Sequence, residues 1–500
     1  MSRADLQPSR EAFLKESRES TVVPVVRELI ADWWTPVAAF QRLAARSAHA
    51  FLLESVEQGE RVGRYSFLGR RPFLTVRARG SKVRAEGEDA SRHATGGPPL
   101  EVLERILAAY RSRHREDLPP FISGAVGVFG FDTVRWVETL PVRHAQRAIE
   151  DDLTLLFLED VVAFDHVRRR LFLVANARVH AGDNAGAAYD RAVERLALME
   201  RDLFAPFSPP AEGADALPAL PDPVPNQDPE TFQSAVRQAK EHINAGDIFQ
   251  VVLSQRFTVP GRFEDLALYR ALRAVNPSPY MFLLRWEGAS AVGSSPEPLV
   301  RVQGRRLEYR PIAGTAPRSG DPAEDARRAE AMLGDPKERA EHVMLVDLGR
   351  NDLGRVAEPG SVSVDELMRV ERYSHVMHLV SGLSGTLRAG LSPLDALYAC
   401  FPAGTVSGAP KIRAMELIEE LEPDARGLYA GAVGYLDFSG NLDTCIALRT
   451  MIVRPNEVCI QAGAGIVADS DPLREYEETR HKARALIEAV RLARRLGSHG

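Results

Sequence analysis

The stretch from Gly431 to Ala462, GAVGYLDFSGNLDTCIALRTMIVRPNEVCIQA, decides the fold class of this chain. Three apolar runs follow one another in it, at Gly431–Phe438, Ile446–Val453 and Val458–Ala462, and only short turns separate them. Apolar runs of this length that are bounded by turn residues are typical of β-strands. Strands joined by such short turns predict an antiparallel sheet.

The same kind of sequence extends outward in both directions. Helices are expected at Leu100–Arg111 and Asp228–Ala245. Further strands are expected at Phe51–Leu53, Phe73–Val76, Leu153–Leu158, Arg170–Val174, Phe249–Leu253 and Tyr280–Trp286. Strands in short-turn succession with helices interspersed predict an α+β fold whose sheets are mostly antiparallel.

A proline-rich segment divides the chain. Residues 208–229 read SPPAEGADALPALPDPVPNQDP, a density of proline that excludes helix interiors and central strands. The segment is therefore expected to be a linker or a long surface connection. It separates an N-terminal region at residues 21–207, which follows a tail at residues 1–20, from a C-terminal domain at residues 230–497.

The composition is that of a globular protein with no nucleic-acid or membrane partner. The net charge of −6 provides no basic face for nucleic acid, and no apolar stretch reaches the length that spans a bilayer. Residues 1–20 are charged and lack the apolar core of a signal peptide, so a cytoplasmic location is expected. Cys400, Cys445 and Cys459 are odd in number and show no CxxC spacing, which favours buried reduced thiols.

The last predicted helix carries a cluster of charges. Asp471 can cap it and Pro472 fits its first turn. At 100° per residue, Glu475, Glu478 and Lys482 fall on the flank of the apolar stripe. Glu478 and Lys482 also form an i,i+4 pair, which by itself is commonly a modest helix stabiliser.

A second predicted helix, at Lys337–Arg350, places Glu341 within an apolar face, with Glu338 one turn earlier. A carboxylate there is costly unless it is paired or bound to a metal. Two acidic helix faces turned toward the core favour an oxygen-ligand site for Mg²⁺, which takes one or two protein carboxylates and keeps room for water and substrate. A salt-bridge network with Arg350 or Lys482 is the competing interpretation.

Two glycine loops resemble nucleotide-binding motifs without matching them. Gly463–Ala468 fits GxGxxA, but the following helix opens too late for a dinucleotide fingerprint. Gly404–Lys411 is too short for a P-loop and has proline before its lysine. With Lys411, Arg449 and Lys482 nearby, these loops instead favour an anion-binding pocket built from backbone N–H groups. The alternative is that the glycines only mark tight turns.

The histidines at positions 375 and 378 fall on opposite faces of a predicted strand, so one of them can face a pocket. By pattern alone, a lone histidine is more often structural than catalytic.

Taken together, these sequence motifs resemble the chorismate-utilising enzymes, and in particular anthranilate synthase component I, the large chorismate-aminating subunit. The matching segments are Gly246–Gln250, Ser294–Glu297, Arg310–Thr315, Glu338–Asp352, Phe401–Lys411, Ile446–Thr450 and Ala462–Thr479. The resemblance covers nearly everything after the linker. It implies antiparallel sheets packed as a sandwich with helices on the outside, in two intertwined subregions.

The resemblance also implies a reaction. Ammonia attacks the chorismate ring, the ring hydroxyl leaves, and pyruvate is then eliminated to give anthranilate. It implies Glu297 as the acid for the leaving hydroxyl, His378 for the elimination, and Mg²⁺ on Glu341 and Glu478. Glu338 and Glu475 would lie close to the metal or bind it through water. The other residues implied at the site are Thr405, Gly314, Thr315, Tyr429, Arg449, Gly463, Ala464, Gly465 and Lys482.

Two positions separate close relatives within the family. Isochorismate and salicylate synthases carry a water-activating lysine where this chain has Gln250, so ammonia is the expected nucleophile. Aminodeoxychorismate synthases typically carry lysine where this chain has Ala313. Both differences favour anthranilate, and aminodeoxychorismate synthase component I is the alternative.

Two further segments resemble the family's tryptophan-binding site and imply feedback inhibition by L-tryptophan. They comprise Leu53, Glu54, Ser55 and Tyr65 in the N-terminal region, and Asn276, Pro277, Ser278, Pro279, Tyr280 and Met281 in the C-terminal domain. The alternative is that the first is only a strand edge and the second only a turn.

The sequence also implies a partner. None of the three cysteines lies in the setting of a glutaminase nucleophile. Use of glutamine is therefore expected to need a separate amidotransferase subunit, component II, whereas free ammonia should support the reaction without it. The expected assembly is a heterotetramer or a homodimer.

Overall fold

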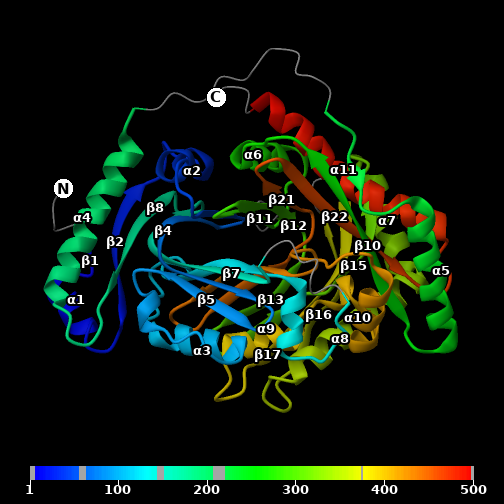
Figure 1. Ribbon diagram of the computed structural model, residues 1–500, viewed down its shortest axis with the longest axis horizontal. Helices are drawn as coiled ribbons and strands as arrows, with labels where there is room; N and C mark the ends of the chain where they lie inside the picture. Colours follow the sequence, from blue (N-terminus) through cyan, green and yellow to red (C-terminus); the bar gives the residue numbers. More distant parts are fainter. Residues whose placement is uncertain (1–5, 56–62, 144–150, 207–219, 373–375, 497–500) are drawn as a thin grey trace.

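The computed structural model describes residues 6–55, 63–143, 151–206, 220–372 and 376–496, except for the side chain of Thr315. Figure 1 shows strands in the middle of the molecule and helices around its periphery. No helix among the described residues is long and apolar enough to cross a membrane.

The N-terminal region is built mainly of strands. They are β1 (Leu6–Gln7), β2 (Val22–Ile30), β3 (Ala50–Glu54), β4 (Tyr65–Arg79), β5 (Lys82–Gly87), β6 (Gly124–Phe129), β7 (Leu153–Asp165) and β8 (Arg170–Arg178). The helices are α1 (Arg10–Glu16), α2 (Pro36–Ala44), α3 (Pro99–Ala109) and α4 (Ala185–Phe204), with the short 3-10 turns η2 (Ala90–Arg92) and η3 (Phe131–Trp136).

The C-terminal half continues the pattern. Its strands are β9 (Val224–Pro225), β10 (Gln250–Pro260), β11 (Tyr280–Trp286), β12 (Ala289–Ser295), β13 (Pro298–Gln303), β14 (Arg306–Tyr309), β15 (Ile312–Pro317), β16 (Ser363–Arg372), β17 (Val376–Thr386), β18 (Gly408–Ala409), β19 (Ala432–Asp437), β20 (Leu442–Ile446), β21 (Thr450–Arg454) and β22 (Glu457–Ile466). Its helices are α5 (Pro229–Ala245), α6 (Asp265–Val275), α7 (Pro322–Gly334), α8 (Pro336–Gly354), α9 (Pro393–Cys400), α10 (Lys411–Leu421) and α11 (Pro472–Leu496), with the turn η4 (Gly404–Val406).

Every strand pairing among the described residues is antiparallel. The two halves of the chain share one hydrogen-bonded path, β12–β11–β3–β4–β7–β6–β19–β20. Strand β3 of the N-terminal region pairs with β11, and β6 pairs with β19. The α+β class, the antiparallel sheets and the intertwining of the two subregions are therefore confirmed.

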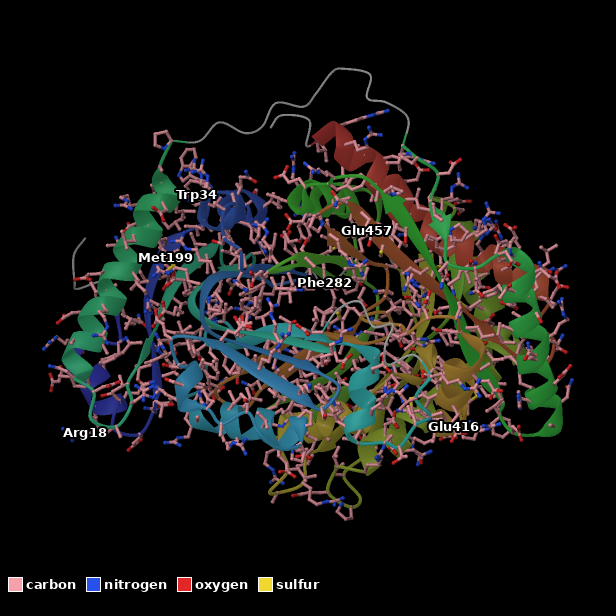
Figure 2. The ribbon with its side chains drawn as sticks, in the orientation of Figure 1. Arg18, Trp34, Met199, Phe282, Glu416 and Glu457 are labelled. Atoms are coloured by element: carbon pink, nitrogen blue, oxygen red, sulfur yellow. The ribbon has the colours of Figure 1, made fainter. Side chains whose placement is uncertain are left out.

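The core lies between the sheet layers and under the peripheral helices. One buried cluster joins the halves directly, because Phe51, Phe67 and Phe121 of the N-terminal region pack with Phe282 and Val433 of the C-terminal half. Phe282 is labelled near the centre of Figure 2 and is 1% exposed. Strand β7 is buried along its whole length, since it is covered on both faces. Its sequence LTLLFLEDVVAFD therefore shows no strict alternation, and Glu159 and Asp160 are buried within it.

The helix boundaries follow from the caps that the sequence indicates. The Asp228 side chain accepts a hydrogen bond from Thr231 N at the start of α5, and Gly246 ends that helix with a φ of 84°. Asp471 accepts from Arg474 N at 3.0 Å, and Pro472 is the first residue of α11. Both predicted starts are confirmed.

One predicted strand is wrong. The run Ile446–Val453 is interrupted, because β20 ends at Ile446 and β21 begins at Thr450. Between them the chain turns at Arg449, which has a φ of 47°. A non-glycine residue in this region is uncommon, and such residues cluster at functional sites. An apolar run cannot reveal this break, because Ala447 and Leu448 are as apolar as strand residues.

Two parts of the predicted domain organisation can be located. The tail at residues 1–20 includes β1 and α1, and Phe13 of α1 is buried against Tyr189 of α4. Most of the predicted linker, residues 208–219, lies outside the described residues. Its C-terminal end contains β9, which pairs with β10.

Candidate active site

A cavity of about 680 Å³ opens in the C-terminal domain between β10, β22, α8 and α11. Its lining contains most of the site residues predicted from sequence: Glu297, Gly314, Glu338, Glu341, His378, Thr405, Tyr429, Arg449, Gly463, Gly465, Glu475, Glu478 and Lys482. They come from separate elements along almost 200 residues of chain, so the fold brings them together. Gln250 lines the same cavity.

Two predicted residues stand apart from this lining. Ala464 is fully buried in the core on the other face of β22, because neighbouring strand residues point in opposite directions. The side chain of Thr315 lies outside the described residues, although its backbone pairs with His378 in the β15–β17 ladder. His375 also lies outside the described residues.

Glu297 is the buried acid of the cavity. It follows the end of β12 and is 7% exposed. Burial raises its pKa to about 8, although the hydrogen bond from Thr405 Oγ1 to Glu297 Oε1, at 3.1 Å, acts in the opposite direction. The carboxyl group is therefore mostly protonated at neutral pH and can act as a general acid.

His378 faces the cavity from β17. Its Nδ1 lies 3.0 Å from the carbonyl oxygen of Gly314, which can only accept, so Nδ1 carries the hydrogen. Burial lowers the pKa of His378, and the nearby Arg449 acts in the same direction. The ring is therefore neutral at pH 7, with Nε2 free of a proton. A histidine in this tautomer can accept a proton at Nε2.

Arg449 brings a positive charge into the cavity at the break between β20 and β21. It is partly buried, and desolvation lowers the pKa of its guanidinium. In the described part of the chain it forms no ion pair, and its side-chain hydrogen bond is a long one, from Nη1 to Asn276 Oδ1 at 3.4 Å. A buried cation without a carboxylate partner is costly unless an anion binds to it.

Two glycines of β22 allow neighbouring groups to approach closely. A Cβ at Gly463 would lie 2.6 Å from the Tyr429 hydroxyl and 2.9 Å from the Leu253 carbonyl oxygen. A Cβ at Gly465 would lie 2.9 Å from Nε2 of Gln250. These glycines therefore shape the cavity, and they are more than markers of a turn.

Lys482 and Gly314 lie at the edge of the glutamate cluster. Lys482 Nζ donates to the Gly463 carbonyl at 3.0 Å and pairs with Glu478 at 2.7 Å, so the predicted i,i+4 pair is present. Gly314 has a φ of 61°, and a Cβ there would lie 2.9 Å from the Glu338 carboxylate. The backbone thus passes close to the acidic side of the cavity.

Four glutamates from two helices form that acidic side. Glu338 and Glu341 come from α8, and Glu475 and Glu478 from α11. Burial raises the pKa of Glu341, and the negative charges of Glu338 and Glu478 act in the same direction. The two helices therefore turn carboxylates toward one another. Among the described residues, no three histidine, cysteine or acidic side chains stand close enough together to hold a metal ion.

The competing salt-bridge interpretation agrees with the structure for Lys482 but not for Arg350. Lys482 pairs with Glu478, but Arg350 pairs with Asp347 on its own helix. A donor set of few carboxylates with room for water still matches what Mg²⁺ requires. The residues present therefore fit a magnesium ion.

The prediction for Lys411 is wrong. Its ammonium group pairs with buried Asp352 at 2.9 Å and donates to the Cys400 carbonyl, and it is not part of the cavity lining. Lys411 therefore joins α10 to α8. The three cysteines are free and buried, as predicted.

Sequence reasoning missed several polar groups of the cavity. Lys337, Gln461 and Arg474 also line it, and so do Asp469 and Asp471. Position gave a signal for two of them, because Lys337 and Arg474 lie within one turn of the predicted metal ligands. Gln461 gave no signal, since it lies inside a strand of unremarkable pattern.

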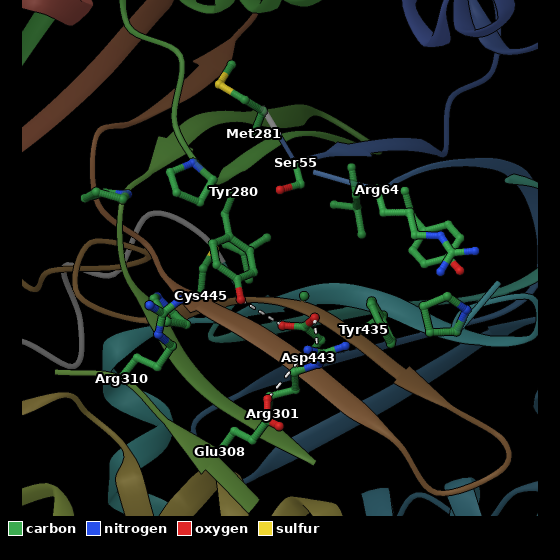
Figure 3. Close-up of a pocket in the computed structure, with 18 of the residues that line it drawn as sticks. Ser55, Arg64, Tyr280, Met281, Arg301, Glu308, Arg310, Tyr435, Asp443 and Cys445 are labelled. Atoms are coloured by element: carbon green, nitrogen blue, oxygen red, sulfur yellow. Dashed lines mark hydrogen bonds and ion pairs between the residues drawn. The ribbon is translucent and has the colours of Figure 1, made fainter. Parts of the chain in front are cut away.

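A second cavity, of about 620 Å³, lies between the two halves of the chain (Figure 3). It contains seven of the residues of the predicted tryptophan segments: Leu53, Glu54, Ser55, Tyr65, Pro279, Tyr280 and Met281. Asn276, Pro277 and Ser278 are not in its lining. On one side of it, the Tyr280 hydroxyl donates to Asp443 at 3.1 Å, and Arg301 lies 3.6 Å from the same carboxylate.

Glu54 and Asn276 have other partners. The carboxylate of Glu54 accepts from the Tyr269 hydroxyl at 2.6 Å and lies 3.4 Å from Arg273, so it is tied to α6. Asn276 follows α6 and contacts Arg449. The two predicted segments are thereby linked through one helix.

The two cavities share a wall, because Pro296 and Ile312 line both of them. Glu297 is the next residue after Pro296 and faces the 680 Å³ cavity.

Comparison with known proteins agrees with this geometry. Residues 48–488 match the family model described as chorismate binding enzyme. The chain is 45% identical to anthranilate synthase component 1 of Synechocystis sp., over 97% of this chain and 99% of the relative. It is 43% identical to the protein of the same name from Geobacillus stearothermophilus, over 98% of each.

Solved structures give the same picture. Anthranilate synthase component I from Streptococcus pneumoniae superposes with a TM-score of 0.74 at 35% identity, over 92% of this chain and 98% of that one. MenF, the menaquinone-specific isochorismate synthase of Escherichia coli, shares the fold with a TM-score of 0.68 at 20% identity, over 96% and 98% of the two chains.

Proposed function

The chain belongs to the chorismate-binding enzymes, within the anthranilate synthase component I group, and from this premise we propose that it converts chorismate and ammonia to anthranilate and pyruvate. The observation that carries the proposal is one cavity that combines the buried acid Glu297 with the cation Arg449 and four glutamates. This conversion supplies anthranilate for tryptophan biosynthesis.

Chorismate is a dicarboxylate, and the cavity offers a place for each carboxylate. Arg449, with the backbone around Gly465, receives the enolpyruvyl carboxylate, because the guanidinium forms no ion pair with any acidic residue that the structure describes. Tyr429 and Lys482 close this side of the cavity. The ring carboxylate then points toward the glutamate helices.

Mg²⁺ is proposed as the cofactor on that acidic side. Glu341 and Glu478 would hold it directly, with Glu338 and Glu475 close by or bridged by water. When bound, the ion supplies Lewis-acid polarisation and neutralises the ring carboxylate. Without a cation, that carboxylate would be repelled by four glutamates.

Glu297 and His378 carry the proton transfers. Glu297 gives its proton to the ring hydroxyl, which leaves as water while ammonia bonds to the ring. Thr405 holds the Glu297 carboxylate in place. In the second step, Nε2 of His378 takes the ring proton while the C–O bond to the enolpyruvyl group breaks, since Nδ1 already donates to the Gly314 carbonyl. The enolate of pyruvate that is released takes a proton at its methylene carbon and becomes pyruvate.

Two residues favour ammonia and anthranilate over related reactions. Gln250 lines the cavity and carries no base for the activation of water. Ala313 cannot form a bond to the ring as a lysine could. Aminodeoxychorismate synthase component I, of the p-aminobenzoate route, remains the second candidate, and the mass of the aromatic product distinguishes the two.

The second cavity is proposed to bind L-tryptophan as a feedback inhibitor. Leu53 and Met281 supply apolar surface for an indole ring, while Ser55, Arg64 and Glu308 provide polar groups at the rim. The shared wall at Pro296 gives the inhibitor a route to Glu297. Inhibition is expected to be reversible and to leave the protein folded.

A component II partner is proposed to supply ammonia from glutamine, because component I in this family acts with such a subunit. Either a heterotetramer or a homodimer of this chain would accommodate the site, which lies within a single chain. A cytoplasmic location without nucleic-acid or membrane partners accords with the net charge of −6.

The test is incubation of the purified chain with chorismate, Mg²⁺ and ammonium at a pH of about 8, where part of Glu297 still holds its proton, with products identified by fluorescence and mass. Anthranilate and pyruvate are expected in equal amounts, and glutamine alone should give none. Formation of another aromatic acid, or turnover of glutamine without a partner, would contradict the proposal.

A further inference from the structure

A buried ion pair lies directly beneath the 680 Å³ cavity. Arg426 and Glu422 have side chains that are 1% and 4% exposed, and they meet in a two-point contact. Arg426 Nε donates to one carboxylate oxygen at 3.0 Å and Nη2 donates to the other at 2.6 Å. Neither residue lines the cavity. Neither has a place in the reaction as proposed above.

The guanidinium of Arg426 also binds the backbone of two cavity segments. Its Nη1 donates to the carbonyl of Val406 in η4, and its Nη2 donates to the carbonyl of Val252 in β10, both at 2.7 Å. The side chains of Val406 and Val252 belong to the cavity lining. Each of the three guanidinium nitrogens therefore donates at least one hydrogen bond. The two bonds to the carbonyls of Val406 and Val252 fix η4 and β10, which together form the floor of the cavity.

The pair extends to two more lining residues. Glu422 Oε1 accepts from Ser254 N and Oγ at 2.8 and 2.9 Å, and Ser254 Oγ accepts from Gln461 at 2.8 Å. The guanidinium also lies 5.4 Å from the ring centre of Tyr429. Gln461 and Tyr429 both line the cavity.

The contact at Val406 matters most for chemistry. Thr405 is the preceding residue in the same short turn, and its hydroxyl donates to Glu297 Oε1. A displacement of the Val406 carbonyl therefore moves the group that orients the buried acid. The turn has only three residues and cannot absorb the displacement internally.

Energetics favour a positioning role over a stabilising one. Two charges taken out of water gain little net stability, because the desolvation cost offsets their attraction. Such a pair does fix geometry, since a planar guanidinium binds carboxylate and carbonyl groups in set directions.

Building on the proposed function, we propose that Arg426, held by Glu422, is a positioning residue that sets the hydrogen bond between Thr405 and Glu297 by fixing η4 against β10.

The experiment compares Arg426→Lys with a matched control. Lysine keeps the charge but cannot bind Glu422 and both carbonyls at once. The control is Arg285→Lys, because Arg285 makes the same kind of two-point contact with Asp265, at 2.8 and 2.6 Å, and also binds backbone carbonyls, at Ala44, Ala45 and Ser47. Arg285 lines neither of the two large cavities, so its loss reports stability alone.

Three readouts are taken with chorismate and ammonium: kcat, KM for chorismate, and the alkaline limb of the pH–rate profile. For Arg426→Lys, kcat falls at least about tenfold while KM changes by less than about threefold, because Arg449 is untouched. Loss of the Thr405 hydrogen bond raises the pKa of Glu297 further, so the acid stays protonated to higher pH. The alkaline limb therefore moves up by about one pH unit, the equivalent of one hydrogen bond to a charged group.

The pH readout has internal checks. Thr405→Val removes the same hydrogen bond directly and should move the alkaline limb in the same direction. Other titratable groups face Glu297: Tyr309 lies close enough to feel its charge, and the cavity also holds His378, Arg449, Lys337, Lys482, Arg474, Asp469, Asp471 and the four glutamates. None of them is altered in either variant. A limb that moves alike in both is therefore assigned to Glu297.

Each outcome is decisive. The inference is overturned if Arg426→Lys behaves like Arg285→Lys, so that both variants lower thermal stability but neither shifts the alkaline limb of the pH–rate profile. If Arg426→Lys does not fold, Glu422→Gln serves instead, because it removes the charge that orients Arg426 and keeps the side-chain shape. If the unmodified chain forms no anthranilate, the proposed function is contradicted. That result is distinct from a failure of the positioning role, which shows only as a difference between variants of an active enzyme.

Discussion

The two glycines of β22 give a sharp test, because three groups crowd a Cβ at Gly463, including Val252 Cγ1 at 3.0 Å, and only one side chain crowds a Cβ at Gly465. In Gly463→Ala, the new methyl group meets the Tyr429 hydroxyl at 2.6 Å and the Leu253 carbonyl oxygen at 2.9 Å. In Gly465→Ala, it meets only the flexible amide of Gln250, at 2.9 Å. Tyr429 is buried and the carbonyl belongs to β10, so neither neighbour of Gly463 can move freely.

The magnitudes follow from those distances. To restore ordinary contact, the Tyr429 hydroxyl must retreat by about 0.8 Å, and a misplacement of about 1 Å in a site costs roughly a hundredfold in rate. Overpacking of this kind also costs about 1–3 kcal/mol of stability. The amide of Gln250 can rotate away, so Gly465→Ala should lose less than about tenfold in kcat/KM.

The assay is ammonium-dependent turnover of chorismate, together with a thermal melt of each variant. Gly334→Ala is the control, because a Cβ there meets nothing within 4 Å. Adding Tyr429→Phe to Gly463→Ala should recover part of the stability, since it removes the nearest atom. Equal losses in Gly463→Ala and Gly465→Ala would refute the reasoning.

Four further predictions address the charged groups. Glu297→Gln should abolish turnover yet raise the melting temperature at neutral pH. The pKa of Glu297 is about 8 in the folded protein and lower in the unfolded chain, so between these two pKa values its ionisation favours the unfolded state more strongly as pH rises. An unchanged melting temperature would count against this. In the unmodified enzyme, the rate should fall as pH rises through about 8, as the acid loses its proton, and a flat profile would exclude Glu297 as the acid. Arg449→Met should raise KM for chorismate, measured by initial rates, by about a hundredfold, which corresponds to about 3 kcal/mol for a charged hydrogen-bonded pair. A lower kcat with an unchanged KM would show that Arg449 does not bind the substrate carboxylate. Glu341→Gln should remove Mg²⁺-dependent turnover and weaken Mg²⁺ binding by calorimetry without unfolding the chain, and retained binding would move the metal site.

Some of the site could be predicted because its residues carry local signals. Glu475, Glu478 and Lys482 lie at helical spacing after the cap at Asp471, and all three line the cavity as that spacing requires. The same spacing places Glu477, Arg480 and Arg484 on the opposite helix face, and they line a different surface pocket. Helix phase is fixed by 3.6 residues per turn, so it can be read without a structure.

Other parts had no local signal. The break between β20 and β21 at Arg449 lies within an apolar run. It arises because β20 pairs with β19 and β21 pairs with β12, so the chain changes its pairing partner there. Lys411 looked available to an anion, but its partner Asp352 is 59 residues away and on another helix. Arg426 and Glu422 form an ordinary i,i+4 pair in the sequence, and their complete burial comes from β10 and η4 packing over them.

The sequence alone determined the antiparallel class, the starts of the capped helices α5 and α11, and the family motifs, because these depend on periodicity, caps and residue identity over short distances. The tertiary structure decided which charges are buried and which groups meet. It raised the pKa of Glu297, gave Arg449 no acidic partner within the part of the chain that the structure describes, and buried Arg426 next to the cavity. The physical reason is that desolvation and hydrogen-bond partners depend on what packs against a side chain, and those neighbours come from segments far away in the chain.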